Sequence, residues 1–275
     1  MKLLLGGWFL AGAAIVVTCA IQFRLPHPDL DMLMVMSPVI FGGEEATVSA
    51  SPIAAKIEGS AVCILRMGRD GKVHIATGVL ISRDRVITAR HVVSGKMGIV
   101  FAPRIGPTTM DDYRAGKLTE ARLLAFPTAS VPAGPASTPW DVAVLQLASP
   151  APADYAPAKL DPEFSLGPGQ AIYFAGYGAG KGSAKARGIL RFSHALVSSV
   201  SDGVAMVSDT RTGICNDDSG GPVYADRDGS LTVVGILAIT DCKSIFGFAV
   251  LGVESAQETR TWLRSVLNAH VVTPN

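Results

Sequence analysis

The chain of 275 residues carries a formal net charge of +1, with 48% hydrophobic and 17% charged residues. This length permits one large domain or two small ones, and the composition excludes an intrinsically disordered chain. The nearly neutral charge provides no long-range field that would favour nucleic acid or an anionic membrane surface. The five histidines are scattered and none has metal-ligand spacing, so we expect neither a metal nor another cofactor.

The first 20 residues have the pattern of an export signal. Lys2 precedes an apolar run over residues 3–21, and the string TCA lies near its end. One positive charge, an apolar segment and small residues at a cleavage point are typical of a secretory signal peptide. We predict that residues 1–20 are removed after Ala20 and that the protein is secreted or periplasmic. The alternative is an uncleaved membrane anchor, because the run is about long enough to span a bilayer.

Residues 21–39 are predicted to form a short pro-segment, since they combine three prolines with a methionine-rich stretch. From Ile40 onward the pattern changes to many short strands. Apolar runs predict strands in a first half at Ala61–Met67, 72–81, 85–89, 98–102, 121–126 and 142–147. Residues 68–71, with the string GRDG, predict a hairpin turn between the first two.

A Pro- and Ala-rich stretch at 150–157 separates a second half, whose predicted strands lie at 171–177, 189–200, 204–208, 222–225 and 231–239. A helix is expected only at 254–269, where Trp262, Leu263, Val266 and Leu267 recur at three- and four-residue spacing. Many short strands, two halves and one terminal helix predict an all-β fold with two β-barrels. We assign the barrels to residues 40–150 and 151–270.

Three short strings carry residues suited to nucleophilic catalysis. Residues 86–91 read VITARH, residues 141–147 read DVAVLQL, and residues 215–222 read CNDDSGGP. Amide hydrolysis needs a nucleophile, a base that takes its proton and a group that orients the base. Ser219, His91 and Asp141 supply these three groups. Each string alone fits an ordinary turn or a structural histidine, but the three together favour a hydrolase.

The strings resemble the signatures of the trypsin/chymotrypsin serine protease family, peptidase family S1. TARH is similar to its TAAH motif, DVAVLQL to its DIALL segment, and DSGGP matches its nucleophile string. The order His, Asp, Ser is also that of the family and differs from those of subtilisins and α/β-hydrolases. The resemblance extends from Ile40 to the terminal helix. It implies a chymotrypsin-like pair of six-stranded antiparallel barrels and a monomeric, bacterial-like secreted serine endopeptidase that acts on protein or peptide substrates.

The string IFGG at residues 40–43 resembles the start of a mature protease in this family. There, a cut before the first residue frees an ammonium group that pairs with the aspartate before the nucleophile. Here the matching residues are Ile40 and Asp218, so we expect a zymogen activated by cleavage after Val39. The alternative is a plain strand start followed by a glycine turn.

The family's oxyanion hole uses the backbone N–H groups of the serine and of a glycine two positions earlier. In this chain these positions are Ser219 and Asp217. Asp217 raises two concerns, a backbone conformation that suits glycine and a negative charge beside the developing oxyanion. We therefore expect Asp217→Gly to raise turnover. A catalytically impaired homologue that acts as a binding protein is the main alternative, and a membrane-anchored protease acting on envelope proteins is another.

Alignment with the family places Gly213, Thr240 and Gly247 around the primary specificity pocket. Gly213 stands where trypsins carry an aspartate, so no carboxylate awaits a Lys or Arg side chain. The resemblance thus implies a preference for small or medium apolar side chains before the cut (P1). Thr240 has the alternative of being an ordinary threonine at the end of a strand.

The chain has four cysteines. Cys19 lies inside the expected signal, and lipidation there fits poorly with Thr18 before it. Three cysteines remain after export, which leaves one thiol free. We expect a Cys215–Cys242 disulfide, which an exported protein allows, and we interpret Cys63 in an apolar string as a buried thiol rather than a nucleophile.

Overall fold

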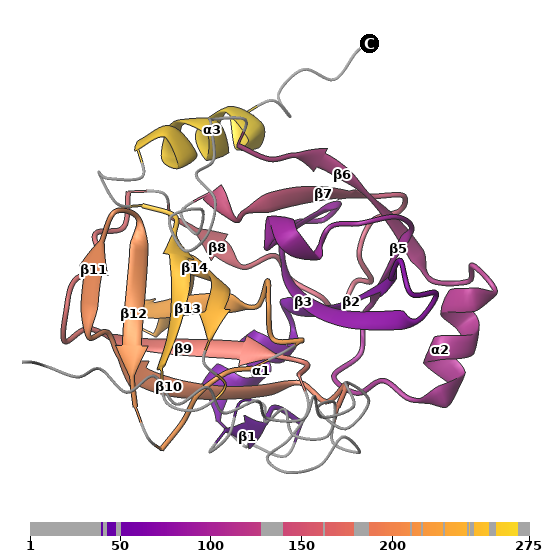
Figure 1. Cartoon of the computed structure of the whole chain (residues 1–275), viewed down its shortest axis with the longest axis horizontal. Coiled ribbons are helices and arrows are strands. Elements are labelled where there is room, and N and C mark those ends of the chain that lie inside the picture. The colour runs from indigo at the N-terminus through magenta and orange to yellow at the C-terminus, as the bar shows by residue number, and fades with distance from the viewer. Residues whose placement is uncertain are drawn as a thin grey trace, which may run out of the picture. The chain divides into compact units, whose positions relative to one another are not determined.

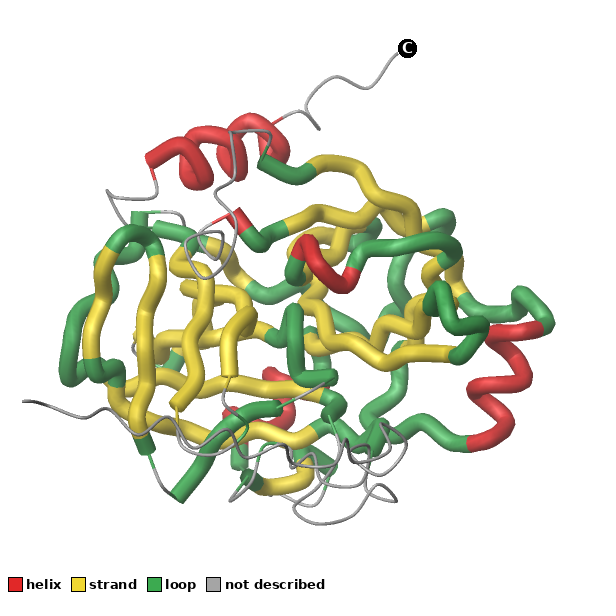
Figure 2. The backbone as a smooth tube through the Cα atoms, viewed as in Figure 1, coloured by secondary structure: helices red, strands yellow, loops and turns green. Residues whose placement is uncertain are grey.

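The computed structural model describes residues 40, 43–47, 51–127, 140–161, 163–178, 187–209, 211–215, 217–227, 229–240, 242, 245–252 and 257–268. The expected signal peptide and pro-segment, residues 1–39, lie outside this part of the chain. Within the described part, strands predominate over helices (Figure 2), and none of its helices has the length and apolar character needed to cross a membrane.

Six strands of the first half close into a barrel in the order β2-β3-β4-β7-β6-β5, with all neighbours antiparallel (Figure 1). They are β2 (Ala61–Met67), β3 (Val73–Ser82), β4 (Arg85–Thr88), β5 (Met97–Val100), β6 (Thr119–Ala125) and β7 (Ala143–Leu147). Their Val-, Ile- and Leu-rich sequences fill the interior of the barrel, which is the usual arrangement for a barrel of this size. The first expected barrel and its β2–β3 hairpin are therefore confirmed.

The second half forms a nine-stranded sheet in the order β1-β10-β9-β13-β14-β15-β12-β11, with β8 also paired to β14. Its strands are β1 (Glu44–Glu45), β8 (Lys159–Leu160), β9 (Ala171–Gly176), β10 (Arg191–Leu196), β11 (Ser199–Ser201), β12 (Val204–Ser208), β13 (Pro222–Arg227), β14 (Ser230–Thr240) and β15 (Ile245–Val250). The strands β1, β8 and β15 were not expected; β1 and β8 have only two residues, too few for a readable periodicity. β8 adds a parallel pair.

The single strand expected at 189–200 is divided into β10 and β11, and this division curls the sheet. β10 pairs with β9, whereas β11 pairs with β12 at the other end of the strand order. Only residues 197 and 198 separate the two strands, and the N–H of Ser198 donates to the carbonyl of Met206 on β12 at 2.8 Å. The chain itself therefore links the two ends of this sheet.

In the described part of the chain, three α-helices accompany the strands: α1 (Pro52–Glu58), α2 (Pro107–Arg114) and α3 (Gln257–Asn268). The terminal helix expected at 254–269 is present as α3, and Leu263 and Val266 are buried in the hydrophobic cluster that includes the core of the first barrel. The helices α1 and α2 were not expected, because 7 and 8 residues hardly display a helical period. Both begin with proline, and Ser51 caps α1 by accepting the N–H of Ile53 at 3.2 Å.

Two buried tyrosines of the second half form hydrogen bonds with residues of the first half. The hydroxyl of Tyr177 donates to the carbonyl of Ala102 at 2.9 Å, and the hydroxyl of Tyr224 shares a 2.9 Å hydrogen bond with that of Ser60. Both tyrosine side chains are fully buried, so water does not compete for these bonds. The residues at the junction of the halves are thereby held in fixed positions.

Candidate active site

The pairing of β4 with β7 brings His91 and Asp141 together. Thr88 at the end of β4 lies opposite Ala143 at the start of β7, and a single 3₁₀ turn at Arg90–Val92 follows β4. The backbone N–H of His91 donates to Asp141 Oδ1 at 2.8 Å, and His91 Nδ1 lies 2.6 Å from Asp141 Oδ2. An ionised carboxylate only accepts hydrogen bonds, so the ring proton sits on Nδ1 and Nε2 is left free to accept.

The turn that carries Ser219 is pressed against the same end of the first barrel. The N–H of Thr77 on β3 donates to the carbonyl of Ser219 at 3.0 Å. Gly220 has φ +84°, and a Cβ there would overlap the hydroxyl of Thr88 and lie 2.9 Å from the nitrogen of Ala89. Only glycine permits this approach. The backbone contact places Ser219 beside the strand end that leads to His91.

Thr77 is the residue that joins these pieces. Besides its N–H bond to Ser219, its hydroxyl donates to the carbonyl of Asp217 at 3.1 Å and accepts the N–H of Tyr177 at 3.0 Å. Its own carbonyl accepts the hydroxyl of Thr88 at 2.7 Å. The side chain is fully buried. Thr77 was not singled out in the sequence, because an isolated threonine in a strand carries no motif.

Asp218 is fully buried behind the turn. Its carboxylate accepts the N–H of Gly178 at 2.9 Å and that of Cys215 at 3.1 Å, and the backbone N–H of Ile40 also donates to it. Burial, helped by the nearby Asp217 charge, raises the pKa of Asp218 to about 7 in spite of these donors. The expected pair of Ile40 and Asp218 is thus in contact, although the Ile40 nitrogen is here a peptide amide without charge.

Asp217 adopts a left-handed backbone conformation, with φ +73°. This is the conformation that suits glycine and that was expected to be unfavourable for an aspartate at this position. Its carboxylate is bound by the guanidinium of Arg187, with Nε 2.7 Å from Oδ2 and Nη2 2.8 Å from Oδ1. The negative charge at this position therefore has a cation in direct contact. Arg187 had no sequence signal, because it lies 30 positions earlier and outside every motif.

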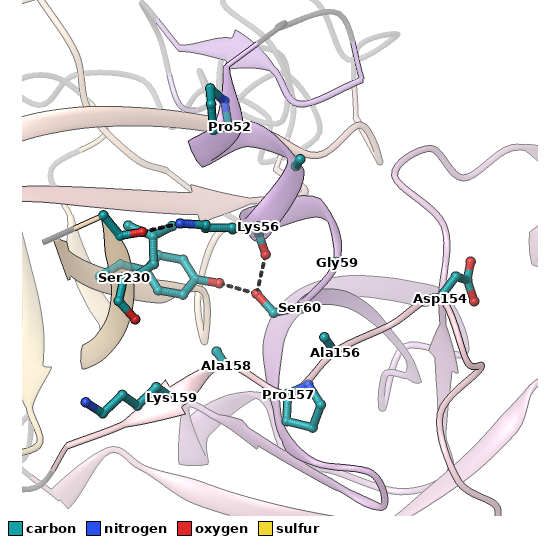
Figure 3. A pocket seen from close by; sticks show the side chains of 14 residues that line it. Pro52, Lys56, Gly59, Ser60, Asp154, Ala156, Pro157, Ala158, Lys159 and Ser230 are labelled. Carbon is teal, nitrogen blue, oxygen red and sulfur yellow. Dashed lines mark hydrogen bonds between the residues drawn. The ribbon is translucent and has the colours of Figure 1, made fainter. Parts of the chain in front are cut away.

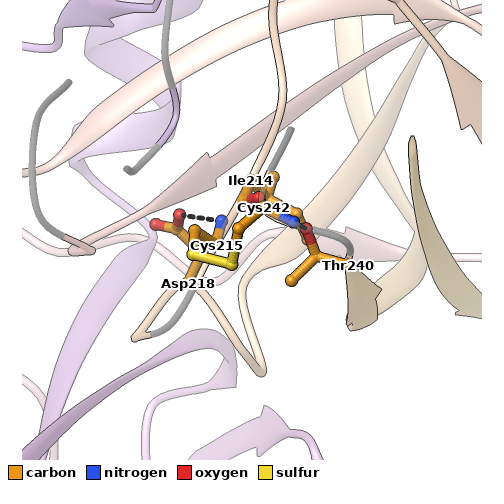
Figure 4. Close-up of a disulfide and its surroundings, with 5 residues drawn as sticks. All are labelled: Ile214, Cys215, Asp218, Thr240 and Cys242. Atoms are coloured by element: carbon orange, nitrogen blue, oxygen red, sulfur yellow. Dashed lines mark hydrogen bonds between the residues drawn. A yellow bond between two sulfur atoms is a disulfide. The ribbon is translucent and has the colours of Figure 1, made fainter. Parts of the chain in front are cut away.

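The expected Cys215–Cys242 disulfide is present and ties the turn to the end of β14 (Figure 4). The hydroxyl of Thr240 donates to the carbonyl of Ile214 at 2.6 Å and accepts the N–H of Cys242 at 2.8 Å. Thr240 therefore braces the disulfide loop. Cys63 is a free buried thiol, as expected, and burial raises its pKa far above the ordinary value, so it is a poor nucleophile.

The other two pocket candidates lie on neighbouring segments. Gly213 is buried just before Ile214, and Gly247 on β15 pairs with Ile239 next to Thr240. A Cβ at Gly247 would lie 2.6 Å from Met206 Sδ, so a larger residue there would require the Met206 side chain on β12 to move. Close packing against β12 is therefore a second reason for a small residue at this position.

A pocket of about 810 Å³ lies between α1, β8 and the β13–β14 hairpin (Figure 3). None of the expected site residues lines it; Lys56, Ser60, Asp154 and Lys159 do. Among the described residues, no three His, Cys, Asp or Glu side chains are grouped closely enough to hold a metal ion.

A family model identifies the family to which the chain belongs. A family model described as a trypsin-like peptidase domain matches residues 76–236, which include His91, Asp141 and Ser219. The chain belongs to this trypsin-like peptidase family. A comparison of this chain with curated protein sequences yields no match. Among solved structures, an inactivated protease paralogue of the scabies mite, S-I1, is similar with a TM-score of 0.57 and 17% identity, covering 78% of this chain and 96% of that one. At that identity the likeness concerns the chymotrypsin-like fold.

The buried carboxyl of Asp218 predicts how the stability of the uncleaved chain varies with pH. Its pKa is about 7 in the folded chain and 3.8 ordinarily. Between these values the folded protein keeps the proton that the unfolded chain releases. The protonated Asp218 therefore contributes fully to the free energy of unfolding below about pH 4, and this contribution declines as the pH rises to about 7. Urea unfolding should show the stability of the wild type falling relative to Asp218→Asn over this range. A difference independent of pH, in protein shown by mass spectrometry to be intact, would contradict the burial argument.

Proposed function

We propose that this trypsin-like domain is an active serine endopeptidase that cuts peptide bonds through an acyl-enzyme on Ser219. The observation that supports the proposal best is the double hydrogen bond from His91 to Asp141 beside the turn of Ser219. The imidazole side chain is 47% exposed, whereas the carboxylate is 16% exposed. The base is thus open to substrate, and the group that orients it is sheltered from water.

In the proposed reaction, Ser219 Oγ attacks the carbonyl carbon of the scissile bond and its proton passes to His91 Nε2. Collapse of the tetrahedral intermediate breaks the C–N bond, and His91 returns the proton to the leaving amine. Water, deprotonated by the same nitrogen, then hydrolyses the acyl-enzyme ester and restores the serine. Asp141 stays ionised throughout and stabilises the imidazolium.

The negative oxygen of the intermediate would be bound by the N–H groups of Ser219 and Asp217. A left-handed residue such as Asp217, followed by a residue with negative φ, makes successive N–H groups converge on an anion. One such donor is typically worth about 2.7–4 kcal/mol of transition-state stabilisation. The hydrogen bond from Thr77 to the Asp217 carbonyl supports this conformation.

A fluorophosphonate probe tests the nucleophile. Labelling should occur in the wild type, vanish in Ser219→Ala, and fall by at least a hundredfold in rate in His91→Ala, because the hydroxyl then has no base. Ser201→Ala, on the surface strand β11, serves as the matched control and should label normally. A folded, activated wild type that resists the probe would instead favour the alternative, a catalytically impaired homologue that uses the same scaffold for binding.

Activation is proposed to follow cleavage between Val39 and Ile40. The Ile40 side chain is 2% exposed and its N–H already donates to Asp218. Just beyond it, Glu45 is held by Arg104 at 2.8 Å and by Arg191 at 3.1 Å, which fixes this segment beside β10. Cleavage would replace a neutral donor by an ammonium, give the buried carboxylate a counter-charge and stabilise the turn that carries Ser219.

Sequencing of the active enzyme should therefore find Ile40 at the N-terminus. Replacing Val39 by proline, which proteases cut poorly, should keep the chain intact and reduce activity at least tenfold. Cutting that protein at an introduced site that exposes Ile40 should restore the activity. Full activity with residues 21–39 still attached would refute the proposed activation.

The substrates are proposed to be proteins or peptides with a small or medium apolar P1 side chain. The family places Gly213 at the base of the pocket, so a basic side chain would find no carboxylate there. Val39 fits this preference, which allows the enzyme to activate itself. The disulfide favours an exported protein, secreted or periplasmic, because such bonds persist in oxidising compartments.

Chromogenic anilides with Ala or Val at P1 should be hydrolysed at least ten times faster than the Arg analogue. Gly213→Asp should shift this ratio toward Arg by introducing the missing carboxylate. A wild type that already prefers Arg would discredit the pocket assignment, while leaving the nucleophile assignment untouched.

A further inference from the structure

The carboxylate of Asp217 occupies a position that is unfavourable for the proposed chemistry. Its own N–H is one of the two proposed donors to the oxyanion, so its side chain starts close to the charge that develops in the transition state. A free carboxylate there would repel that charge and would be drawn to other donors in the turn. The following inference rests on the proposed protease function and concerns how the chain tolerates this residue.

Arg187 offsets the negative charge of the Asp217 carboxylate and holds it away from other donors through a two-point contact. Its Nε lies 2.7 Å from Oδ2 of Asp217, and its Nη2 donates to Oδ1 at 2.8 Å. Such a paired contact fixes the carboxylate plane as well as its distance, which a single bond does not. The Asp217 side chain is 16% exposed and that of Arg187 38%, so the contact is only partly screened by water.

The backbone that carries Arg187 is itself anchored to both halves of the fold. The N–H of Gly188 donates to the carbonyl of Tyr177 at 2.9 Å, and the carbonyl of Gly188 accepts the N–H of Ile105 at 2.8 Å. Gly188 has φ +79°, and a Cβ there would overlap the side chain of Ile105. The guanidinium is therefore presented to Asp217 from a fixed base rather than from a free arm.

Asp217 is consequently held from two sides. Thr77 binds its carbonyl from the first barrel, and Arg187 binds its carboxylate. The two contacts together fix the left-handed backbone and with it the direction of the Asp217 N–H. We propose that Arg187 is a positioning residue of the oxyanion hole, which allows an aspartate to stand where the family has glycine by orienting its N–H and offsetting its charge.

The test uses Arg187→Met, Asp217→Gly and the double variant, assayed for kcat and KM on a small Ala-P1 ester. Arg187→Met should lower kcat at least tenfold with KM changed less than threefold, because the contact matters mainly once the oxyanion forms. Because Arg187 offsets the charge of Asp217, the gain in turnover that the sequence alone predicts for Asp217→Gly should be small, and this variant should be at least as fast as the wild type. The double variant should return to within about threefold of Asp217→Gly, because no carboxylate then needs neutralising.

Two further variants separate positioning from stability. Arg187→Lys keeps the charge but not the two-point contact, so it should recover only part of kcat. Arg114→Met breaks a surface pair with Asp111 on α2 and should leave kcat unchanged. The affinity for a peptide boronic acid, which forms an oxyanion-like adduct, should fall in Arg187→Met in proportion to kcat/KM.

The outcomes distinguish this inference from the function on which it rests. A wild type without labelling or turnover would refute the protease itself. An active wild type with an equally fast Arg187→Met would refute the role of Arg187 alone. So would an Arg187→Met defect that Asp217→Gly leaves uncorrected, because the arginine would then act through some other residue.

Discussion

The arrangement of the site depends on one buried threonine that binds four partners in different parts of the chain. Thr77 donates its N–H to Ser219 and its hydroxyl to Asp217, and it accepts hydrogen bonds from Tyr177 and Thr88. A polar group buried this deeply is costly unless every bond is made, so the set of contacts forms as a unit. It fixes the turn of the second half against the strand end of the first, where the proposed nucleophile and base must meet.

Three aspartates close to Thr77 and its partners each have a different kind of hydrogen-bond partner. Asp141 faces the imidazole of His91, and Asp217 faces the guanidinium of Arg187. Asp218 is fully buried and is bound by N–H groups of Gly178, Cys215 and Ile40, of which none carries charge in the uncleaved chain. Burial without a cationic partner raises the pKa of Asp218 to about 7. It also makes the Ile40 nitrogen the place where the proposed cleavage would introduce a positive charge.

Elements and site residues could be predicted from the sequence where they have a local sequence pattern. Apolar runs located the strands of the first barrel, and the spacing of Leu263 and Val266 located α3. The strings around His91, Asp141 and Ser219 named the candidate site. Contacts between distant residues left no such pattern: Arg187 meets Asp217 across 30 positions and Thr77 meets it across 140. The short helices α1 and α2 were missed because they are set by capping and proline rather than by periodicity, and the bend between β10 and β11 because both pieces read as one strand.

The most direct test of the central claim is a crystal structure of the activated enzyme with a peptide boronic acid. The account predicts boron bonded to Ser219 Oγ, with His91 Nε2 and the N–H groups of Ser219 and Asp217 within about 2.6–3.2 Å of the adduct's oxygens. The hydrogen bonds from Thr77 to Ser219 and Asp217 should be intact. An ordered structure in which the boronate avoids Ser219, or in which this turn has left Thr77 while the inhibitor is bound, would contradict the account.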